Sequence, residues 1–291
     1  QVKKNSGKPF IVCWLDAPEK SINELRNTGI YVIGATERAV DVVAGLVEYG
    51  QSLVRLKSEP QRGLFGFSRR TTSGVSKSIS SMDSVSFLEG SGVSLVPTYL
   101  ARNANDAKKI ANELGYPVVI KIESPDITHK SEIGGVHLGL LNEDSVYDSA
   151  TEILTSVKQL VPNAKINGIL VQKMIMDGIE FVLGIRRDPI FGPIVMFGLG
   201  GVFIEVFEDV SFAAAPITVV QAAFMLDSLK SKVLLKGVRG NLPVNEQYLK
   251  KMICNLSAFA VSNPEIVELD LNPLVANGDK IVAVDWLIIV D

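Results

Sequence analysis

Short apolar runs, each about the length of one buried strand, alternate along most of the chain with longer segments that have the period of an amphipathic helix. Neither kind of segment can bury its apolar face alone, so the alternation requires helices packed against sheets. We therefore expect an α/β fold, with an α+β arrangement where the alternation is less regular. The 291 residues, 47% of them hydrophobic, can bury a substantial core, and the length suggests two domains.

The segment 1–56 has the pattern of one small α/β unit. Apolar runs at 9–15 and 30–33 alternate with helical stretches at 18–27 and from Thr36 onward. Two parallel strands with two helices are too few to cover both faces of a sheet. We therefore predict that this segment is the C-terminal end of a larger doubly wound domain.

Residues 57–81 are rich in Ser, Thr, Gly and Arg, which predicts a linker, and 82–291 then alternate again as a second, mixed domain. In that domain we expect strands at 117–122, 136–141, 168–173, 180–186, 194–197, 267–271 and 281–284, and helices at 105–114, 143–160, 218–228 and 244–262.

The charge of the chain argues against nucleic acid and membrane surfaces as partners. Lys and Arg number 29 against 32 Asp and Glu, a net charge of −3, and no basic run is longer than a pair such as Arg69-Arg70. The most apolar stretch, 190–207, is interrupted by Pro193 and four glycines, so it cannot form a membrane helix. We expect neither nucleic-acid nor membrane binding.

The two cysteines, Cys13 and Cys254, match no metal-ligand or redox spacing, which predicts reduced thiols in a cytoplasmic protein. The chain begins with Gln1 and has no methionine before Met82. We interpret this as an interior start, from a longer or a processed protein.

A lysine interrupts the apolar strand expected at 117–122. A charged side chain at Lys121 needs an anionic partner or a route to solvent. A phosphate is one such partner, and an edge-strand lysine that faces water is an equally good interpretation. The loop that follows, 124–135, contains hydroxyls, the pair His129-Lys130 and paired glycines. Such a loop can fold over phosphates, although a glycine pair more often marks a plain turn.

Oxygen-bearing side chains recur near the C-terminus. Asp270 and Asn272 point to one side of an expected strand, because alternate residues share a face, and Asp285 follows on the next strand pattern. Two carboxylates and an amide suit Mg²⁺, which keeps water and substrate phosphates among its ligands. A polar stripe that faces solvent is the alternative interpretation.

Together these segments resemble the ATP-grasp part of the nucleoside-diphosphate-forming (ADP-forming) acyl-CoA synthetases, relatives of succinyl-CoA synthetase. The matching stretches, in chain order, are 115–121, 124–136, 171–174, 184–193, 198–205 and 269–274, with Asp285. The resemblance covers 82–291 and implies an ATP-grasp fold, while 1–56 resembles the end of the flavodoxin-like domain that precedes it in fused family members.

The resemblance implies roles for individual residues in binding ATP or ADP with Mg²⁺. Lys121 is expected to contact the α- and β-phosphates, and Asp270, Asn272 and Asp285 to hold the metal. The backbone of a hinge is expected to recognise adenine, and a glutamate to reach the ribose or phosphates. These nucleotide-binding positions are Gln172, Lys173, Met174, Glu180, Gly200 and Gly201.

The same resemblance implies that His129 relays the phosphoryl group as a phosphohistidine, with Lys130 beside it. Imidazole suits the task, because it is largely an unprotonated nucleophile at neutral pH. A loop histidine in an unrelated sequence is more often structural.

The expected activity is the ATP-grasp share of acyl-CoA + ADP + phosphate ⇌ acid + CoA + ATP. The CoA-binding domain and the domain with the first phosphorylated histidine are missing, so we expect them as partners, from a longer polypeptide or another subunit, in an oligomer. One alternative is a ligand-sensing module of a protein lysine acetyltransferase, without ligase activity. Another is an ATP-grasp ligase that makes an amide bond, which the flavodoxin-like segment disfavours. The sequence identifies neither the acid used nor the preference between ATP and GTP.

Overall fold

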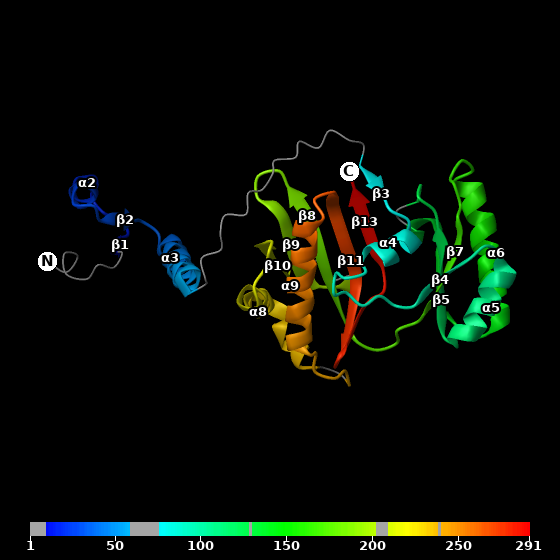
Figure 1. The fold of residues 1–291 in the computed structure, drawn as a ribbon. Coiled ribbons are helices and arrows are strands. Elements are labelled where there is room, and N and C mark those ends of the chain that lie inside the picture. Colours follow the sequence, from blue (N-terminus) through cyan, green and yellow to red (C-terminus); the bar gives the residue numbers. More distant parts are fainter. Residues whose placement is uncertain (1–9, 59–75, 128–129, 202–208, 238–239) are drawn as a thin grey trace. The chain divides into compact units, whose positions relative to one another are not determined.

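The computed structural model describes residues 10–58, 76–127, 130–201, 209–237 and 240–291. The chain divides into two units, Gln1–Gly66 and Phe67–Asp291, which are described separately (Figure 1). No helix in the described part of the chain is both long and apolar enough to cross a membrane.

The first unit is a small parallel βαβ motif followed by a long helix. Strands β1 (Ile11–Cys13) and β2 (Tyr31–Ile33) pair in parallel, joined by α2 (Glu19–Asn27), and α3 (Thr36–Ser58) follows. None of residues 10–54 is buried, and Val40 of α3, for example, is 65% exposed. The described part of this unit therefore has no hydrophobic core of its own.

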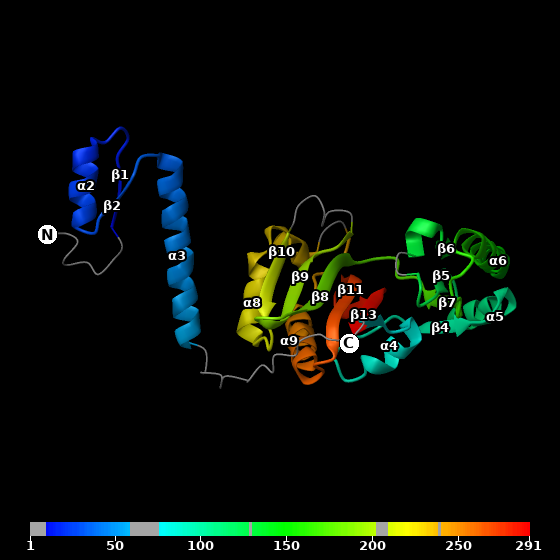
Figure 2. The ribbon, with the colours of Figure 1, turned by 90° about the horizontal axis from the view of Figure 1, so that it is seen from above.

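The second unit contains two sheets, the smaller of which is fully antiparallel. Its order is β4 (Thr98–Ala101), β7 (Gly168–Lys173), β5 (Val118–Glu123) and β6 (Val136–Leu140). Helices α5 (Ala104–Leu114) and α6 (Glu143–Leu160) lie along one face of this sheet (Figure 2). That face supplies a core that includes Ile120, Ile153 and Val171, so the other face is left for different contacts.

In the part of the chain that the structure describes, the larger sheet has seven strands. Its order is β10 (Val210–Ala214), β9 (Gly192–Leu199), β8 (Ile179–Asp188), β11 (Ile266–Asn277), β13 (Trp286–Val290) and β3 (Lys77–Ser78), with β12 (Lys280–Ala283) paired to β11. Helices α8 (Val219–Ser228) and α9 (Glu246–Ser262) contribute to its core with side chains such as Met225 and Leu256, which pack with Phe181 and Leu271.

The mixed α/β plan is confirmed, and segments with strong local signals match their predicted bounds. Helix α6 covers Glu143–Leu160 because Asn142 and Ser145 form a capping box at its start. Strands β4, β10 and β13 and the short helix α4 (Ser81–Phe87) were not predicted. Strand β11 is twelve residues long, more than twice the five predicted, because it pairs with three neighbours.

The end of the predicted linker differs from the structure. Ser78 pairs with Ile289 in the larger sheet, and Ser81 begins α4. The backbone N–H of Ser81 also donates to the buried carboxylate of Glu123, at 2.8 Å. Residues 76–81 therefore belong to the second unit, because long-range contacts outweigh their loop-like composition.

Asp209 anchors the turn that follows α8. Its carboxylate accepts hydrogen bonds from the backbone N–H groups of Lys230 and Ser231, both at 2.7 Å, where the 3₁₀ helix Lys230–Lys236 begins. Burial raises the pKa of Asp209, but the hydrogen bonds from Ser231 and Lys230 outweigh it and hold the pKa below its usual value. The ionised carboxylate is thus favoured in the folded state.

Asp209→Ala is expected to lower the free energy of unfolding by about 1–2 kcal/mol at pH 7, the usual effect of losing such a cap. Because the folded-state pKa is depressed, this stabilisation is present above the unfolded-state pKa and is lost as pH falls through the folded-state value. Denaturant unfolding at neutral and acid pH measures the difference, with the exposed Asp227→Ala as control. An equal effect at both pH values contradicts the account.

Candidate functional site

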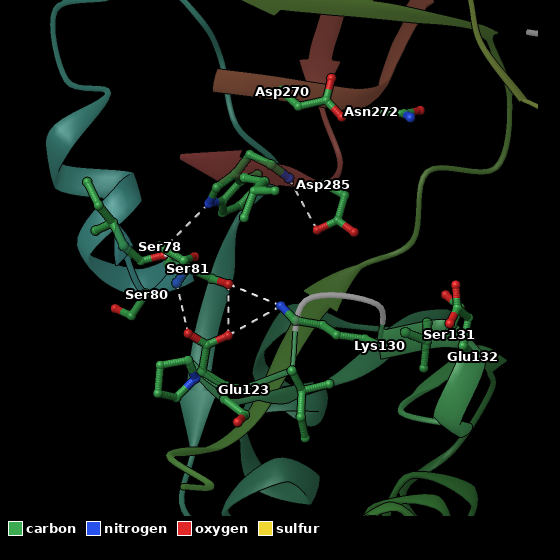
Figure 3. Close-up of a pocket in the computed structure, with 17 residues that line it drawn as sticks. Ser78, Ser80, Ser81, Glu123, Lys130, Ser131, Glu132, Asp270, Asn272 and Asp285 are labelled. Carbon is green, nitrogen blue, oxygen red and sulfur yellow. Dashed lines mark hydrogen bonds and ion pairs between the residues drawn. The ribbon is translucent and has the colours of Figure 1, made fainter. Parts of the chain in front are cut away.

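A cavity of about 420 Å³ lies in the second unit, between the loop after β5, the middle of β11 and the start of β13. Most of the residues that line it are polar. They include Ser78, Ser80, Ser81, Glu123, Ser124, Lys130, Ser131, Glu132, Asp270, Asn272 and Asp285 (Figure 3). One lysine and several carboxylates from distant parts of the chain therefore line the same cavity.

Lys121 lies on β5, an interior strand of the smaller sheet, and its side chain is only 5% exposed. The interpretation as an edge-strand lysine that faces water is therefore wrong. Its Nζ donates to the carbonyl oxygen of Val284 at 3.1 Å and forms an ion pair with Oδ1 of Asp285 at 3.3 Å. Burial lowers the pKa of Lys121, and the charge of Asp285 only partly offsets this. The buried ammonium thus depends on an anionic partner.

Backbone pairing places Asp285 next to β11. The N–H of Asn272 donates to the carbonyl of Asp285 at 3.1 Å, and the N–H of Val284 donates to that of Pro273 at 2.9 Å. The register between β11 and β8 shifts between Leu271 and Leu274, and such bulges can redirect side chains beside a site. In Figure 3, Asp285 lies between the pair Asp270 and Asn272 and the ammonium of Lys130. The structure thus brings together the three metal ligands suggested by the sequence.

The carboxylates of Asp270, Glu268 and Asp285 repel one another. Burial, together with the charges of Glu268 and Asp285, raises the pKa of Asp270 to about 6. In the described part of the chain, no three His, Cys, Asp or Glu side chains cluster into a metal site. The protein offers two carboxylates and the Asn272 amide, an oxygen set that fits Mg²⁺ when phosphates and water supply the remaining ligands.

Glu123 and Ser81 belong to the site but were not predicted from the sequence. Glu123 is 2% exposed, and its carboxylate accepts from both the N–H and the Oγ of Ser81, each at 2.8 Å. The Nζ of Lys130 lies 3.4 Å from the same carboxylate and 3.2 Å from Ser81 Oγ. Glu123 could have been found, because it is two residues from Lys121 on one strand and therefore shares its face. Ser81 carried no such signal.

Lys130 therefore lines the cavity with its ammonium already paired to Glu123. The predicted relay residue His129 lies outside the described residues, as does Thr128 before it. Lys130 begins the 3₁₀ helix Lys130–Ile133.

The predicted hinge residues Gln172, Lys173 and Met174 are not among the residues that line this cavity. The Nζ of Lys173 donates to the carbonyl oxygens of Gly115 and Tyr116, at 2.9 and 2.8 Å, and so holds the C-terminal end of α5. Its side chain has a structural contact, whereas a role for the hinge backbone stays a prediction.

Glu180, Gly200 and Gly201 lie together, although they do not line the cavity. The N–H of Gly200 donates to the carbonyl of Glu180 at 2.7 Å, and a Cβ at Gly200 would come within 2.8 Å of that carbonyl carbon. Gly201 has φ +72°, and a Cβ there would be 3.1 Å from Glu180 Oε2. Close approach and a left-handed backbone therefore explain both glycines. Residues 202–208, directly after them, lie outside the described residues.

A model of the ATP-grasp domain family matches residues 71–290. The chain is 42% identical over 191 residues to the beta subunit of the Pyrococcus furiosus acetate–CoA ligase [ADP-forming] I, covering 65% of this chain and 82% of that subunit. It is 35% identical over 276 residues to the Archaeoglobus fulgidus acetate–CoA ligase [ADP-forming] I, covering 92% of this chain but only 40% of that protein. The chain thus spans less than half the length of the latter relative.

Solved structures agree. The second unit is similar to the dinucleotide forming acetyl-coenzyme A synthetase 1 of Ca. Korarchaeum cryptofilum, in complex with coenzyme A, Ca-AMPCP and HgCl+. The TM-score is 0.71 at 42% identity, and the match covers 74% of this chain and 94% of that chain. The comparisons give no support to a ligand-sensing module without ligase activity. The family expected from the sequence motifs is confirmed: the chain belongs to the ADP-forming acetate–CoA ligases and carries their ATP-grasp domain.

Proposed function

We propose that this chain is the nucleotide-handling part of an ADP-forming acyl-CoA synthetase. It binds ATP or ADP with Mg²⁺ in the cavity and exchanges a phosphoryl group, as its share of acyl-CoA + ADP + phosphate ⇌ acid + CoA + ATP. The observation that carries the proposal is the buried Lys121, paired with Asp285 beside the cavity that Asp270 and Asn272 line.

Each partner of the ion pair has a separate task when the nucleotide is bound. The Lys121 ammonium neutralises negative charge on the phosphates. Phosphoryl transfer is catalysed mainly by positioning and by electrostatic stabilisation of the transition state. Asp270, Asn272 and Asp285 supply the oxygen ligands for the metal. Bound Mg²⁺ contributes charge neutralisation at the phosphates. The remaining nucleotide contacts we assign to the hinge Gln172, Lys173 and Met174 and to the group Glu180, Gly200 and Gly201.

For the relay we propose His129. An imidazole nitrogen attacks the γ-phosphorus of ATP, the bond to the β–γ bridging oxygen breaks, and ADP leaves with that electron pair. The reverse step forms ATP from ADP. Glu123 supports this loop, because it holds the ammonium of the adjacent Lys130 beside the cavity. A related Korarchaeum structure, 38% identical and with a TM-score of 0.64, contains Mg-AMPPCP with a phosphohistidine segment pointing towards the nucleotide binding site.

The first unit we interpret as the end of a flavodoxin-like domain, residues 1–56. Its exposed apolar side chains and the lack of buried residues at 10–54 fit a piece of a larger core. The CoA-binding and first phosphohistidine domains then come from a longer polypeptide or from a partner subunit, as the name of the Pyrococcus beta subunit suggests for that relative. An oligomeric, cytoplasmic enzyme is part of the same proposal.

The relay is tested with the 291-residue chain, Mg²⁺ and ATP labelled at the γ-phosphate. We expect acid-labile, base-stable label on the protein, and none on His129→Ala. The other histidine, His137 on β6, provides the matched control, because His137→Ala is expected to retain the label. Label that survives His129→Ala overturns the relay, whereas absence of label from the native chain limits the phosphorylated histidine to the missing domains.

A further inference from the structure

A glycine of the larger sheet lies directly beside the carboxylate of Asp270. Gly184 on β8 pairs with Asp270 on β11 and with Met196 on β9, and opposite residues of antiparallel strands share a face. The neighbours of Gly184 along β8, Leu183 and Ile185, belong to the hydrophobic core that α8 and α9 share. Because alternate residues of a strand point to opposite faces, Gly184 is on the other face, together with Asp270 and Met196.

Asp270 is held in place by packing. In the part of the chain that the structure describes, its carboxylate has no hydrogen-bond donor and no ion-pair partner, and the charges that act on it are the carboxylates of Glu268 and Asp285. Carboxylates that bind metals are usually oriented by hydrogen bonds from neighbouring groups. Since Asp270 lacks such bonds, the atoms that it packs against determine where its oxygens lie.

The backbone of Gly184 is one of these packing partners. A Cβ built on Gly184 would lie 3.4 Å from Oδ1 of Asp270 and 3.7 Å from Cε of Met196. The two side chains therefore approach Gly184 from either side, and the glycine is buried beside them. A side chain larger than a methyl group at this position would have to displace either the carboxylate or the thioether.

The fold itself does not require glycine at position 184. Gly184 has no positive φ, and a single added Cβ would make only ordinary van der Waals contacts. Glycine weakens the interior of a strand, and it often marks a place where another group must approach the backbone closely. Gly198 on β9 is different, because a Cβ there would come within 2.7 Å of the backbone oxygen of Asp209. Gly198 is thus explained by packing, whereas Gly184 is not.

We propose that Gly184 is a positioning residue of the metal site, because its missing side chain leaves the Asp270 carboxylate room to lie against β8. The inference rests on the proposed function, since it assumes that Asp270 binds Mg²⁺. A branched side chain at position 184 pushes the carboxylate away from its place beside Asn272 and Asp285 in the cavity wall. Met196 fills the space on the other side, so the new side chain cannot turn away from Asp270.

The test is calorimetric titration of the 291-residue chain with ADP, with and without Mg²⁺. The ratio of the two dissociation constants gives the magnesium effect, which the proposed metal site makes favourable in the native chain. Gly184→Val is expected to reduce this effect at least about tenfold, the usual cost of disturbing a group that orients a metal ligand. ADP binding without Mg²⁺ should stay within about threefold of the native value. Gly184→Ala, whose Cβ fits beside Oδ1, should keep the magnesium effect.

A second substitution tests whether valine acts through the carboxylate. Met196→Ala opens space on the far side of position 184, so the double variant Gly184→Val, Met196→Ala can place its branched side chain there. We expect the double variant to recover a magnesium effect within about threefold of that of Met196→Ala alone. Failure of this recovery shows that valine does not act by displacing Asp270, and overturns the inference.

Thermal unfolding of the free protein separates positioning from a structural role. Valine favours strands, so the Tm of Gly184→Val is expected to equal or exceed that of the native chain. Gly198→Ala is the control, with a lower Tm and an unchanged magnesium effect. A magnesium effect that Gly184→Val leaves unchanged overturns the inference but not the proposed function. Absence of any magnesium effect in the native chain overturns the proposed metal site and the inference together.

Discussion

Lys121→Met is expected to weaken the binding of Mg-ADP by at least about a hundredfold, because a buried ammonium is removed from a site that must neutralise phosphates. The free protein should lose no stability. Burial already disfavours the charged form of this lysine, which lowers its pKa, and methionine fills a similar volume. The partner carboxylate of Asp285 is 45% exposed and can be hydrated when the lysine is gone. Calorimetric titration and thermal unfolding measure the two effects.

Lys108→Met is the matched control. Lys108 on α5 also forms an ion pair, with Glu143 at 3.1 Å, but its side chain is 33% exposed and it does not line the cavity. Removal of this pair is expected to leave Mg-ADP affinity unchanged and to have little effect on stability, because exposed ion pairs contribute little to it. Similar losses of affinity in both variants would show that general charge, rather than the site, controls binding, and would contradict the role of Lys121.

Asp270→Asn should have opposite effects on the free and the liganded protein. Burial and the charges of Glu268 and Asp285 raise the pKa of Asp270 to about 6, so its ionised form is strained at neutral pH. The neutral amide relieves this strain and is expected to stabilise the free protein by about 1–3 kcal/mol. The loss of a metal ligand is expected to weaken Mg-ADP binding by about a hundredfold. Thermal unfolding with and without Mg-ADP reports both.

Glu268→Gln tests the charge repulsion on Asp270 separately from the binding of the metal. Glu268 contributes to the raised pKa of Asp270 but does not line the cavity. Its replacement should therefore stabilise the free protein to a smaller extent and leave the metal ligands in place. If Asp270→Asn destabilises the free protein, repulsion at Asp270 does not cost stability. If this variant binds Mg-ADP as tightly as the native chain, Asp270 is not a metal ligand.

Local signals predicted the elements that depend on them. Helix α6 and strand β7 were predicted at their observed bounds, because caps, periodicity and turn residues act within a few residues. Strands β10 and β13 were missed, since each is a short segment that gains its strand character by pairing with β9 or β11. Asp270, Asn272 and Asp285, which the family motifs suggested as metal ligands, all line the cavity, and metal binding by them stays a prediction.

The remainder of the site depends on contacts that sequence patterns do not contain. Lys121 could equally have faced water, and only its interior strand and its distance to Asp285 decide otherwise. Ser81 looked like part of a linker, yet it binds Glu123 across 42 residues of sequence. The side-chain amide of Gln172 donates a hydrogen bond to the hydroxyl of Thr98, 74 residues away, so no local pattern could have revealed this contact.

In the free protein, Lys121 of the smaller sheet and Asp285, between β12 and β13, neutralise each other. A phosphate that arrives without its metal can capture the ammonium, but it then leaves the carboxylates Asp270 and Asp285 facing a second anion. A metal that bound Asp285 as proposed, without phosphate, would draw this carboxylate away and leave the buried ammonium of Lys121 unpaired. Each ligand alone therefore breaks the ion pair between Lys121 and Asp285 and leaves one of the two charges without a partner. When both ligands bind, the phosphate pairs with Lys121 and the metal pairs with Asp285. Metal and nucleotide should bind with positive cooperativity, each lowering the dissociation constant of the other by the same factor.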